Sequence, residues 1–433
     1  MASFDGSRRD VLIGGAGIAA SAVAIRLCKL GFRPMILATG GHILPGIEAI
    51  PEAALPLVKE LGLEPVLRKA NSVVVEGFEN HWRVDEPELR PGKWIHVERS
   101  LLAKAAILEA VHHGAVLRLC RSLPKLSSRS SSVHIALDGV RLHFEAAIDA
   151  TGRSAVWSRP VRRRGKQLAD IFKCPRELSL RGRVVRLGKG WAYRIGVEGS
   201  TTVAILTPQR GSRAADAKAQ EALGIARGEF EHTGRRPAFP QWSENPVQQR
   251  RLAIGDAALA YDPLAGQGIR FALSSALTAA AVVNTWRHSP RGRAKAAHFY
   301  YDYVDQSRRQ HLKFISQLRA PKTSAAVATG LLQEVVVFSG QTKITELQVE
   351  SGIVTGEALI LPGGAAVRWV GGVDLLRVRD LARSPVRPSE MAERLASPEC
   401  SPSHITAVLD WCMRHGLISA AADTFLERRT SVT

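Results

Sequence analysis

Residues 11–20, VLIGGAGIAA, join a short apolar strand to a glycine-rich turn and the start of a helix. Gly15, Gly17 and Ala20 stand at the small positions of a dinucleotide-binding fingerprint. A helix is expected over residues 22–30, and a second apolar strand follows it, which makes a βαβ unit. The glycines let the backbone approach a pyrophosphate, and the helix N-terminus offers free N–H groups to the phosphates. The stretch predicts an α/β nucleotide site; a packing contact of a small-residue helix is the alternative when the stretch is taken alone.

The end of the second predicted strand departs from the usual form of such sites. An acidic residue normally stands there and holds the ribose, whereas residues 38–41 of this chain read ATGG. Thr39 offers only a hydroxyl group. We therefore expect a weaker ribose contact through Thr39, and the sequence does not predict tight binding of the nucleotide.

Two later segments fit the same domain. Residues 149–152, DATG, follow an apolar strand, and residues 255–268, GDAALAYDPLAGQG, lead into a long helix of small residues. Asp256, at a strand end, can accept hydrogen bonds from hydroxyl groups of a cofactor. The amides of Gln267 and Gly268 give the helix start a positive dipole end, which stabilises negative charge on a reduced flavin. This third segment is the most specific of the motifs.

The three motifs, in this order and spacing, resemble those of the group A flavoprotein monooxygenases and the related flavin-dependent halogenases, over roughly residues 8–290. The resemblance implies FAD as the cofactor, O2 as the co-substrate, and reduction by NAD(P)H or by a separate flavin reductase. Arg99, in the stretch HVERSLL, matches the family arginine that opens a helix beside the FAD; a solvated first-turn residue is the alternative. The FAD-binding residues implied in this way are Gly15, Gly17, Ala20, Thr39, Arg99, Asp256, Pro263, Gly266, Gln267 and Gly268.

The pattern as a whole predicts an α/β fold with three parts. These are a discontinuous Rossmann-like FAD-binding domain of the glutathione-reductase type, a β-sheet substrate domain, and a small, mostly helical, winged-helix-like C-terminal module. Short β-like pieces and then two helices, at 388–395 and 403–415, predict the module. The expected ranges are 1–70, 98–170 and 250–290 for the FAD-binding domain, 71–97 and 171–249 for the substrate domain, 291–330 for a connecting helix, and 331–433 for the module.

Two details separate the branches of the family that the chain resembles. Halogenases carry a Trp-x-Trp-x-Ile-Pro motif, whereas residues 191–196 read WAYRIG and lack the second Trp and the Pro. Halogenases bind chloride at a Ser-Thr-Gly, whereas residues 265–268 read AGQG, the monooxygenase form. The resemblance therefore implies hydroxylation of an aromatic ring through a flavin C4a-hydroperoxide. Trp191 and Tyr193 are either substrate-lining residues or ordinary aromatic residues of a strand.

Two side chains in the loop after the second strand are candidates for a catalytic base. A base that takes a phenol or indole proton would assist oxygen transfer, and the family resembled by this chain approaches the flavin with this loop. Glu48 and His42 lie there. For each of them, a surface carboxylate or a surface imidazole is the alternative.

The formal net charge of +19 favours an acidic partner, since such a charge raises encounter rates with acidic surfaces. A merely solvated basic surface is the alternative. The signature GD-x(6)-PLAGQGI, the missing strand-end acid and the extra module are together similar to the flavoprotein monooxygenase family of quinohemoprotein amine dehydrogenase maturation. That resemblance implies a tryptophan side chain as the substrate. It would lie in a small acidic polypeptide, a subunit of the dehydrogenase, and its hydroxylation would belong to the biogenesis of a tryptophylquinone cofactor.

Two other functions stay open at this point. One is hydroxylation or halogenation of a small aromatic metabolite. The other is a flavin-binding regulator that reads DNA through its C-terminal module. The second helix of the module offers only His404, Arg414 and His415 to a nucleic acid, which disfavours DNA binding.

The sequence also bears on the compartment. The five cysteines are scattered, with no ligand spacing, so neither a metal site nor a disulfide framework is predicted and a reducing compartment is favoured. Residues 7–13, SRRDVLI, resemble a twin-arginine signal, but the apolar run after them holds the glycine fingerprint. No other run has the length of a bilayer span. We therefore expect a cytoplasmic protein with no membrane segment.

Overall fold

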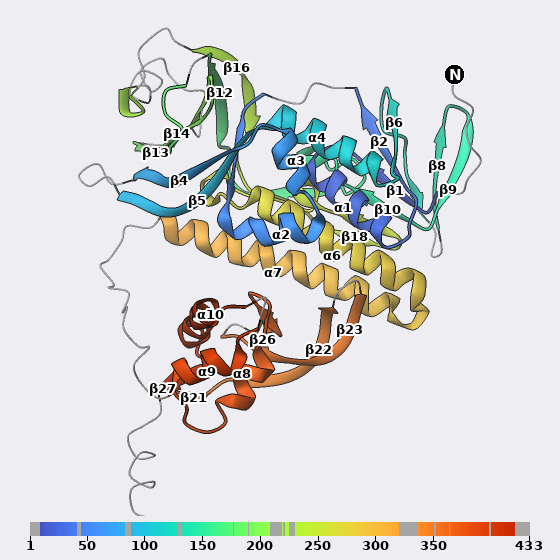
Figure 1. Cartoon of the computed structure of the whole chain (residues 1–433). Coiled ribbons are helices and arrows are strands. Elements are labelled where there is room, and N and C mark those ends of the chain that lie inside the picture. The colour runs from blue at the N-terminus through green and yellow to red at the C-terminus, as the bar shows by residue number, and fades with distance from the viewer. Residues whose placement is uncertain are drawn as a thin grey trace, which may run out of the picture. The chain divides into compact units, whose positions relative to one another are not determined.

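The chain folds into two compact units, residues 1–319 and 320–433, seen in Figure 1. Each unit is described by itself. The computed structural model describes residues 9–40, 45–82, 88–128, 132–175, 177–188, 190–207, 219, 221–224, 230–319, 336–349, 352–362, 364–397 and 400–420.

A six-stranded sheet forms the centre of the nucleotide-binding part of the first unit, in the order β18-β19-β10-β1-β2-β6. All neighbours in it are parallel except β18 and β19. β1 and β10 are buried along their whole length, as expected for a parallel sheet with both faces covered. The strands are β1 (Val11–Gly14), β2 (Pro34–Thr39), β6 (Val116–Cys120), β10 (Ala146–Asp149), β18 (Val247–Gln248) and β19 (Arg251–Ala253).

Helix α1 (Ile18–Lys29) packs against both α4 (Arg99–His112) and α6 (Gly268–His288). Buried alanines on α1 and α6 permit this close packing. Helix α7 (Arg293–Arg319) runs along α6 (Figure 1). The shorter helices are η1 (Glu52–Ala54), α2 (Leu55–Leu61), α3 (Glu64–Lys69), η2 (Gly152–Ser154), η3 (Gly255–Ala257), η4 (Pro263–Ala265) and η5 (Pro290–Gly292).

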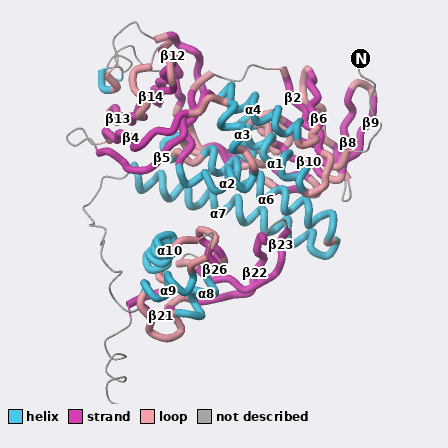
Figure 2. Tube along the Cα trace, viewed as in Figure 1, coloured by secondary structure: helices cyan, strands magenta, loops and turns pink. Residues whose placement is uncertain are grey.

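A second, eight-stranded sheet has the order β16-β12-β15-β14-β13-β4-β5-β3. Its neighbours are antiparallel except β4 and β13, whose parallel pairing joins two distant parts of the sequence. Figure 2 shows β4, β5, β12, β13 and β14 gathered in one region of the first unit. The strands are β3 (Ile47–Pro51), β4 (Val73–His81), β5 (Glu88–Glu98), β12 (Leu168–Cys174), β13 (Gly182–Leu187), β14 (Gly190–Val197), β15 (Ser200–Thr207) and β16 (Glu231–Pro237).

Strand β3 differs from its expected place. The predicted range 1–70 assigned it to the FAD-binding domain, whereas the structure pairs β3 with β5 in the eight-stranded sheet. The pairing buries Ile47 and Ile50. Two small sheets complete the first unit: β11 (Val161–Arg163), β17 (Gln241–Ser243) and β20 (Leu259–Ala260), and β7 (Ser127–Ser128), β8 (Val133–Leu137) and β9 (Val140–Phe144).

The second unit has its own core beneath three helices. The two helices expected from the sequence correspond to α9 and α10, and the apolar segment expected after them is strand β27. The hairpin β22–β23 is longer than the short β-like pieces expected from the sequence. Ile405, Leu409 and Cys412 form the buried side of α10. The elements are β21 (Val336–Phe338), β22 (Gln341–Val349), β23 (Gly352–Ile360), β24 (Ala366–Val367), β25 (Trp369–Val370), β26 (Val373–Asp374), α8 (Leu375–Leu381), α9 (Pro388–Leu395), α10 (Pro402–Arg414) and β27 (Ile418–Ala420).

The α/β fold predicted from the sequence is confirmed. None of the helices in the described ranges combines the length and the apolar character that crossing a bilayer requires.

Candidate functional site

The glycine-rich turn between β1 and α1 is shaped by close backbone packing. Gly15 has φ of +101°, and a Cβ added to it would lie 2.4 Å from the carbonyl oxygen of Ala150. Gly17 is different, because a Cβ there would meet no described atom within 4 Å. Gly17 is the N-cap of α1 and has no side chain with which to cap the helix, so the first amides of α1 face open space. The turn thus fits a phosphate group, as the sequence predicts; Ala20 lies buried behind it.

The start of α6 repeats this arrangement. Gln267 is the N-cap of α6, and among the described residues no side chain caps the helix there. A Cβ added to Gly268 would also meet no described atom within 4 Å. Pro263 opens η4, and Gly266, with φ of +61°, ends it in the left-handed conformation that glycine favours. Two helix N-termini therefore offer free amides.

The second and third motifs meet the first at the carboxyl ends of β1, β10 and β19. The Asp149 carboxylate accepts hydrogen bonds from the backbone N–H of Thr151, at 3.1 Å, and of Trp157, at 2.7 Å, which fixes the turn after β10. Gly255 packs against α1, since a Cβ there would lie 3.1 Å from the Cβ of Ala19. Folds of this kind bind ligands at the carboxyl ends of the parallel strands. The three sequence motifs are therefore brought together as predicted.

Asp256 stands at this edge with a side chain that is 43% exposed. Its carboxylate lies 3.8 Å from Nε of Arg153. The two terminal guanidinium nitrogens of Arg153 donate hydrogen bonds to the backbone carbonyls of Phe239 and Tyr261. Partial burial raises the pKa of the Asp256 carboxyl group and the Glu48 carboxylate adds to the rise, whereas Arg153 and Arg99 oppose it. The accessible carboxylate suits hydroxyl groups of a ligand. Sequence reasoning missed Arg153, although its place directly after DATG is a signal.

Arg99 begins α4 and forms an ion pair with Glu48 of β3. Burial alone would lower the pKa of the Arg99 guanidinium, but the Glu48 carboxylate raises it above its ordinary value. Because Glu48 is held by Arg99, the pairing competes with the role of catalytic base expected of Glu48. That role stays a prediction. The other candidate, His42, lies outside the described residues.

Trp191 and Tyr193 share one face of β14, with ring centroids 5.6 Å apart. Trp191 is buried in an apolar cluster with residues such as Ile171 and Leu206, which makes it a core aromatic. Tyr193 lies close enough to Arg99 and Glu48 to feel their charges. Burial raises the pKa of Tyr193 to about 12, although Arg99 opposes the rise. The two aromatic residues therefore differ in role, and only Tyr193 borders the charged cluster.

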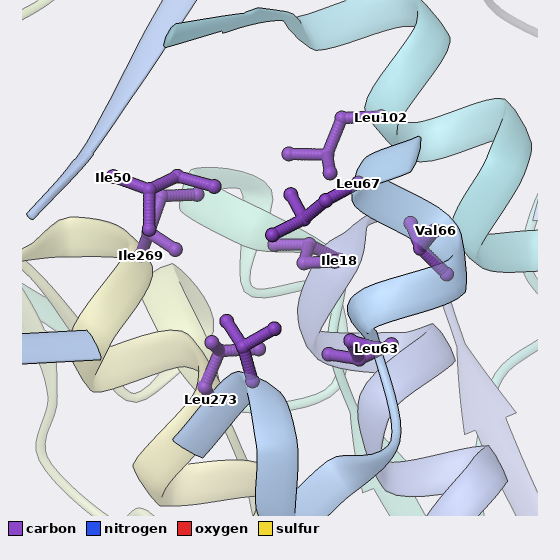
Figure 3. Close-up of a pocket in the computed structure, with 9 residues that line it drawn as sticks. Ile18, Ile50, Leu63, Val66, Leu67, Leu102, Ile269 and Leu273 are labelled. Atoms are coloured by element: carbon purple, nitrogen blue, oxygen red, sulfur yellow. The ribbon is translucent and has the colours of Figure 1, made fainter. Parts of the chain in front are cut away.

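Thr39 ends β2 and is exposed, so its hydroxyl group is accessible at the sheet edge. The ribose contact expected of it stays a prediction. A small apolar cavity of about 10 Å³ lies behind the two helix starts, where Ile18 and Ile269 point toward it (Figure 3). Its other lining residues are Ile50, Val58, Leu63, Val66, Leu67, Leu102 and Leu273. It has room for about one water molecule, so it is a packing defect rather than a substrate site.

This chain is similar to solved structures over most of its length. It shares 21% identity and a TM-score of 0.66 with the peptidyl tryptophan dihydroxylase QhpG, described as essential for tryptophylquinone cofactor biogenesis, over 95% of this chain and 100% of that one. With CmlS, a flavin-dependent halogenase, the sequence identity is 16% and the TM-score is 0.73, over 97% of each chain. With PqsL, a probable FAD-dependent monooxygenase from Pseudomonas aeruginosa, the sequence identity is 18% and the TM-score is 0.56, over 71% of this chain and 94% of that one.

The chain has the fold of the flavin-dependent monooxygenases and halogenases. The resemblance inferred from the three motifs is thereby confirmed at the level of the fold. No protein-family model and no curated protein matches the sequence.

Proposed function

We propose that this protein binds FAD and hydroxylates an aromatic ring, with a tryptophan side chain of an acidic polypeptide as its substrate. The observation that carries the proposal is the convergence at one sheet edge. The open N-termini of α1 and α6 meet there beside the accessible carboxylate of Asp256. In this fold, such an edge is the place for a flavin dinucleotide.

Different residues at this edge would hold different parts of the cofactor. The amides after Gly17 would hold the pyrophosphate, and Asp256 would accept hydrogen bonds from ribityl hydroxyl groups. The amides at Gln267 and Gly268 would lie against the flavin ring, where the positive end of the α6 dipole favours the reduced, anionic form. When bound and reduced, FAD would supply the two electrons with which one atom of O2 enters the substrate and the other leaves as water.

The neighbouring side chains would shape the place of reaction. Glu48 fixes the direction of the Arg99 guanidinium beside the ring, so it acts in this account as a positioning residue. The ring of Tyr193, which lies close to this pair, would form a wall that keeps water out. Hydroxylation is favoured over halogenation because residues 191–196 and 265–268 lack the halogenase motifs.

A polypeptide substrate is supported by two observations. QhpG, similar over most of the length of this chain, is by its description a peptidyl tryptophan dihydroxylase. In addition, residues 1–319 hold 48 Lys and Arg against 28 Asp and Glu, whereas residues 320–433 hold 11 against 12. The basic surplus of the first unit suits an acidic partner. Such a partner would be a subunit of a quinohemoprotein amine dehydrogenase. The electrons that reduce the FAD would come from NAD(P)H or from a flavin reductase in the cytoplasm.

The alternative of a DNA-reading regulator loses support from the second unit. His404 is hydrogen-bonded to the carbonyl of Gly371 at 2.7 Å, and Arg414 is paired with Asp410 at 2.6 Å. His415 stacks on Trp411. The three side chains of α10 considered for contact with a nucleic acid are thus engaged within the unit.

Mass spectrometry tests the proposed function. The protein would be mixed with FAD, dithionite-reduced or supplied with NADH and a flavin reductase, in air, together with an acidic polypeptide containing tryptophan. We expect a gain of oxygen that maps to a tryptophan. At limiting FAD, Asp256→Ala should lose the gain, and Glu390→Ala, at an exposed carboxylate of α9 in the second unit, should retain it. Oxidation of free indoles or phenols with an unchanged polypeptide would replace the proposal by a small-molecule hydroxylase, and halogenated products would replace it by a halogenase.

A further inference from the structure

A run of basic residues follows the DATG motif and belongs to none of the flavin motifs. Residues 151–250 hold 20 Lys and Arg against 8 Asp and Glu, a surplus of 12 basic residues. Within it, five exposed basic side chains lie in or beside β11. They are Arg159, Arg162, Arg163, Arg164 and Lys166. We name these residues the basic edge.

The backbone of β11 is paired on one side. The order β11-β17-β20 makes β11 the outer strand, and no strand covers its other side in the described part of the chain. Hydrogen bonds from the N–H of Glu244 to the carbonyl of Pro160, at 3.1 Å, and from the N–H of Arg164 to the carbonyl of Pro240, at 2.9 Å, mark the paired positions. By the alternation of an antiparallel ladder, the N–H and C=O groups of Val161 and Arg163 point away from β17. They are available to a further strand.

A cavity of about 310 Å³ adjoins this strand. Its wall joins Arg162 of β11 and Trp242 of β17 to Tyr301 and Arg308 of α7. The Arg308 guanidinium lies 5.4 Å from the Trp242 ring centroid, and Tyr301 is 43% exposed. A volume in this range accommodates a small ligand or one large side chain. The aromatic walls favour an apolar or aromatic group.

The charges around the cavity favour a peptide over a nucleic acid. Arg162 is paired with Glu244 at 2.7 Å, and Arg308 with Asp305 at 2.5 Å. These two carboxylates offset the positive charge at the mouth of the cavity, which favours an uncharged side chain there over a phosphate, whereas the rest of the basic edge attracts acidic side chains. Pro160 and the like charges on the edge also oppose pairing of β11 with a second copy of this chain.

We propose that the basic edge and the adjoining cavity form a docking site for an extended acidic segment of a partner polypeptide. The segment adds as a strand to β11 and places one aromatic or aliphatic side chain in the cavity. This mode supplies affinity through main-chain hydrogen bonds and specificity through a side-chain pocket. The identity of the partner as a polypeptide rests on the proposed function; the site itself lies on residues outside the flavin motifs.

Fluorescence anisotropy of the full-length protein tests the site. The probe is a fluorescein-labelled peptide in which Glu alternates with Thr around a single Trp. Arg163→Glu combined with Arg164→Glu should weaken binding about tenfold. The matched control, Lys125→Glu combined with Arg141→Glu, makes the same change of net charge at exposed residues elsewhere and should leave binding within about twofold. Equal loss in the two variants would show attraction by net charge alone and would overturn the site.

Two altered peptides test the mode of binding. N-methylation of alternate backbone amides removes the strand hydrogen bonds, so binding should be lost in the methylated peptide. Tyr301→Ala should weaken the Trp peptide about threefold and leave a peptide with Ala in place of Trp unchanged. Unaltered binding of the methylated peptide would exclude strand addition. Displacement of the peptide by a single-stranded oligonucleotide that binds more tightly would replace the polypeptide partner by a nucleic acid.

The experiments can refute the docking site and the proposed function independently of each other. Peptide binding is measured with oxidised protein and needs no turnover, whereas hydroxylation is read as a gain of oxygen. If the charge-reversed variant binds the peptide as well as the control does, the docking site is wrong even if tryptophan is hydroxylated. If every variant binds as expected and no peptide gains oxygen, the docking site stands and the proposed function fails.

Discussion

The carboxyl edge of the six-stranded sheet and the face of the eight-stranded sheet that carries Tyr193 offer different kinds of surface. The first exposes backbone, because Gly17 and Gly268 leave open space before two helices. The second exposes large side chains, since Tyr193 and Arg99 fill the space beside Glu48. On a surface made of backbone, a single added Cβ takes the place of the ligand. A surface made of side chains changes gradually with each substitution.

The largest effect should come from Gly15→Ala. This residue combines φ of +101° with a Cβ that would stand 2.4 Å from a backbone oxygen. We expect the flavin-free protein to lose about 3 kcal/mol of its free energy of unfolding. The urea-unfolding midpoint, followed by tryptophan fluorescence, measures this loss. An unchanged midpoint would show that the turn relaxes easily and that the backbone surface is less rigid than described.

Gly17→Ala is the matched control for Gly15→Ala and sharpens the comparison. Its φ is −82° and its Cβ would point into open space, so the flavin-free protein should keep its stability within about 0.5 kcal/mol. The added methyl group would instead occupy the place of the pyrophosphate. We expect the affinity for FAD to fall about tenfold, which corresponds to about 1.4 kcal/mol. Titration of FAD by its fluorescence measures this, and equal affinity in the variant would place the phosphates elsewhere.

Asp256→Asn should lower the affinity for FAD without lowering the melting temperature of the protein. Burial raises the pKa of the Asp256 carboxyl group above 3.8, so the ionised form is disfavoured in the folded chain relative to the unfolded one. This penalty grows as the pH rises above 3.8 and is complete above the folded pKa. At pH 8 the neutral amide should therefore melt no lower than the wild type, while FAD affinity falls about tenfold. A lower melting temperature would mean that the carboxylate stabilises the fold, contrary to its raised pKa.

The smallest effect is expected at Tyr193. Its pKa of about 12 keeps the phenol neutral at working pH, so Tyr193→Phe should change neither FAD binding nor the pH profile of turnover. Tyr193→Ala should admit water and raise the fraction of hydrogen peroxide released, roughly twofold. An assay of peroxide against substrate oxidised gives this fraction. If the Phe and Ala variants release the same fraction as the wild type, Tyr193 does not border the reaction site.

The backbone surface could be predicted from the sequence, because each of its parts is a short contiguous motif. Gly15, Gly17 and Ala20 lie within one turn, and Asp256 directly follows Gly255. Parallel strands end at one edge, so local motifs after β1, β10 and β19 meet there without any knowledge of distant contacts.

The side-chain surface could not be predicted in the same way. The pair of Glu48 and Arg99 depends on the antiparallel register of β3 and β5, whose contacts join distant residues. The role of Arg153 depends on Phe239 and Tyr261, both far away in the chain. The hairpin β22–β23 was underestimated because β22 is largely polar on both faces and its Ile344 is exposed.

Isotopic labelling of O2 tests whether this protein inserts oxygen from O2 into a tryptophan ring. The protein, reduced FAD and an acidic tryptophan-containing polypeptide would react under heavy-isotope O2 in ordinary water, and the polypeptide would be mapped by mass spectrometry. We expect heavy oxygen on the tryptophan ring, with Gly17→Ala giving less of it at limiting FAD and the same amount at saturating FAD. Incorporation of ordinary oxygen from water, or heavy oxygen that appears equally without the protein, would contradict it.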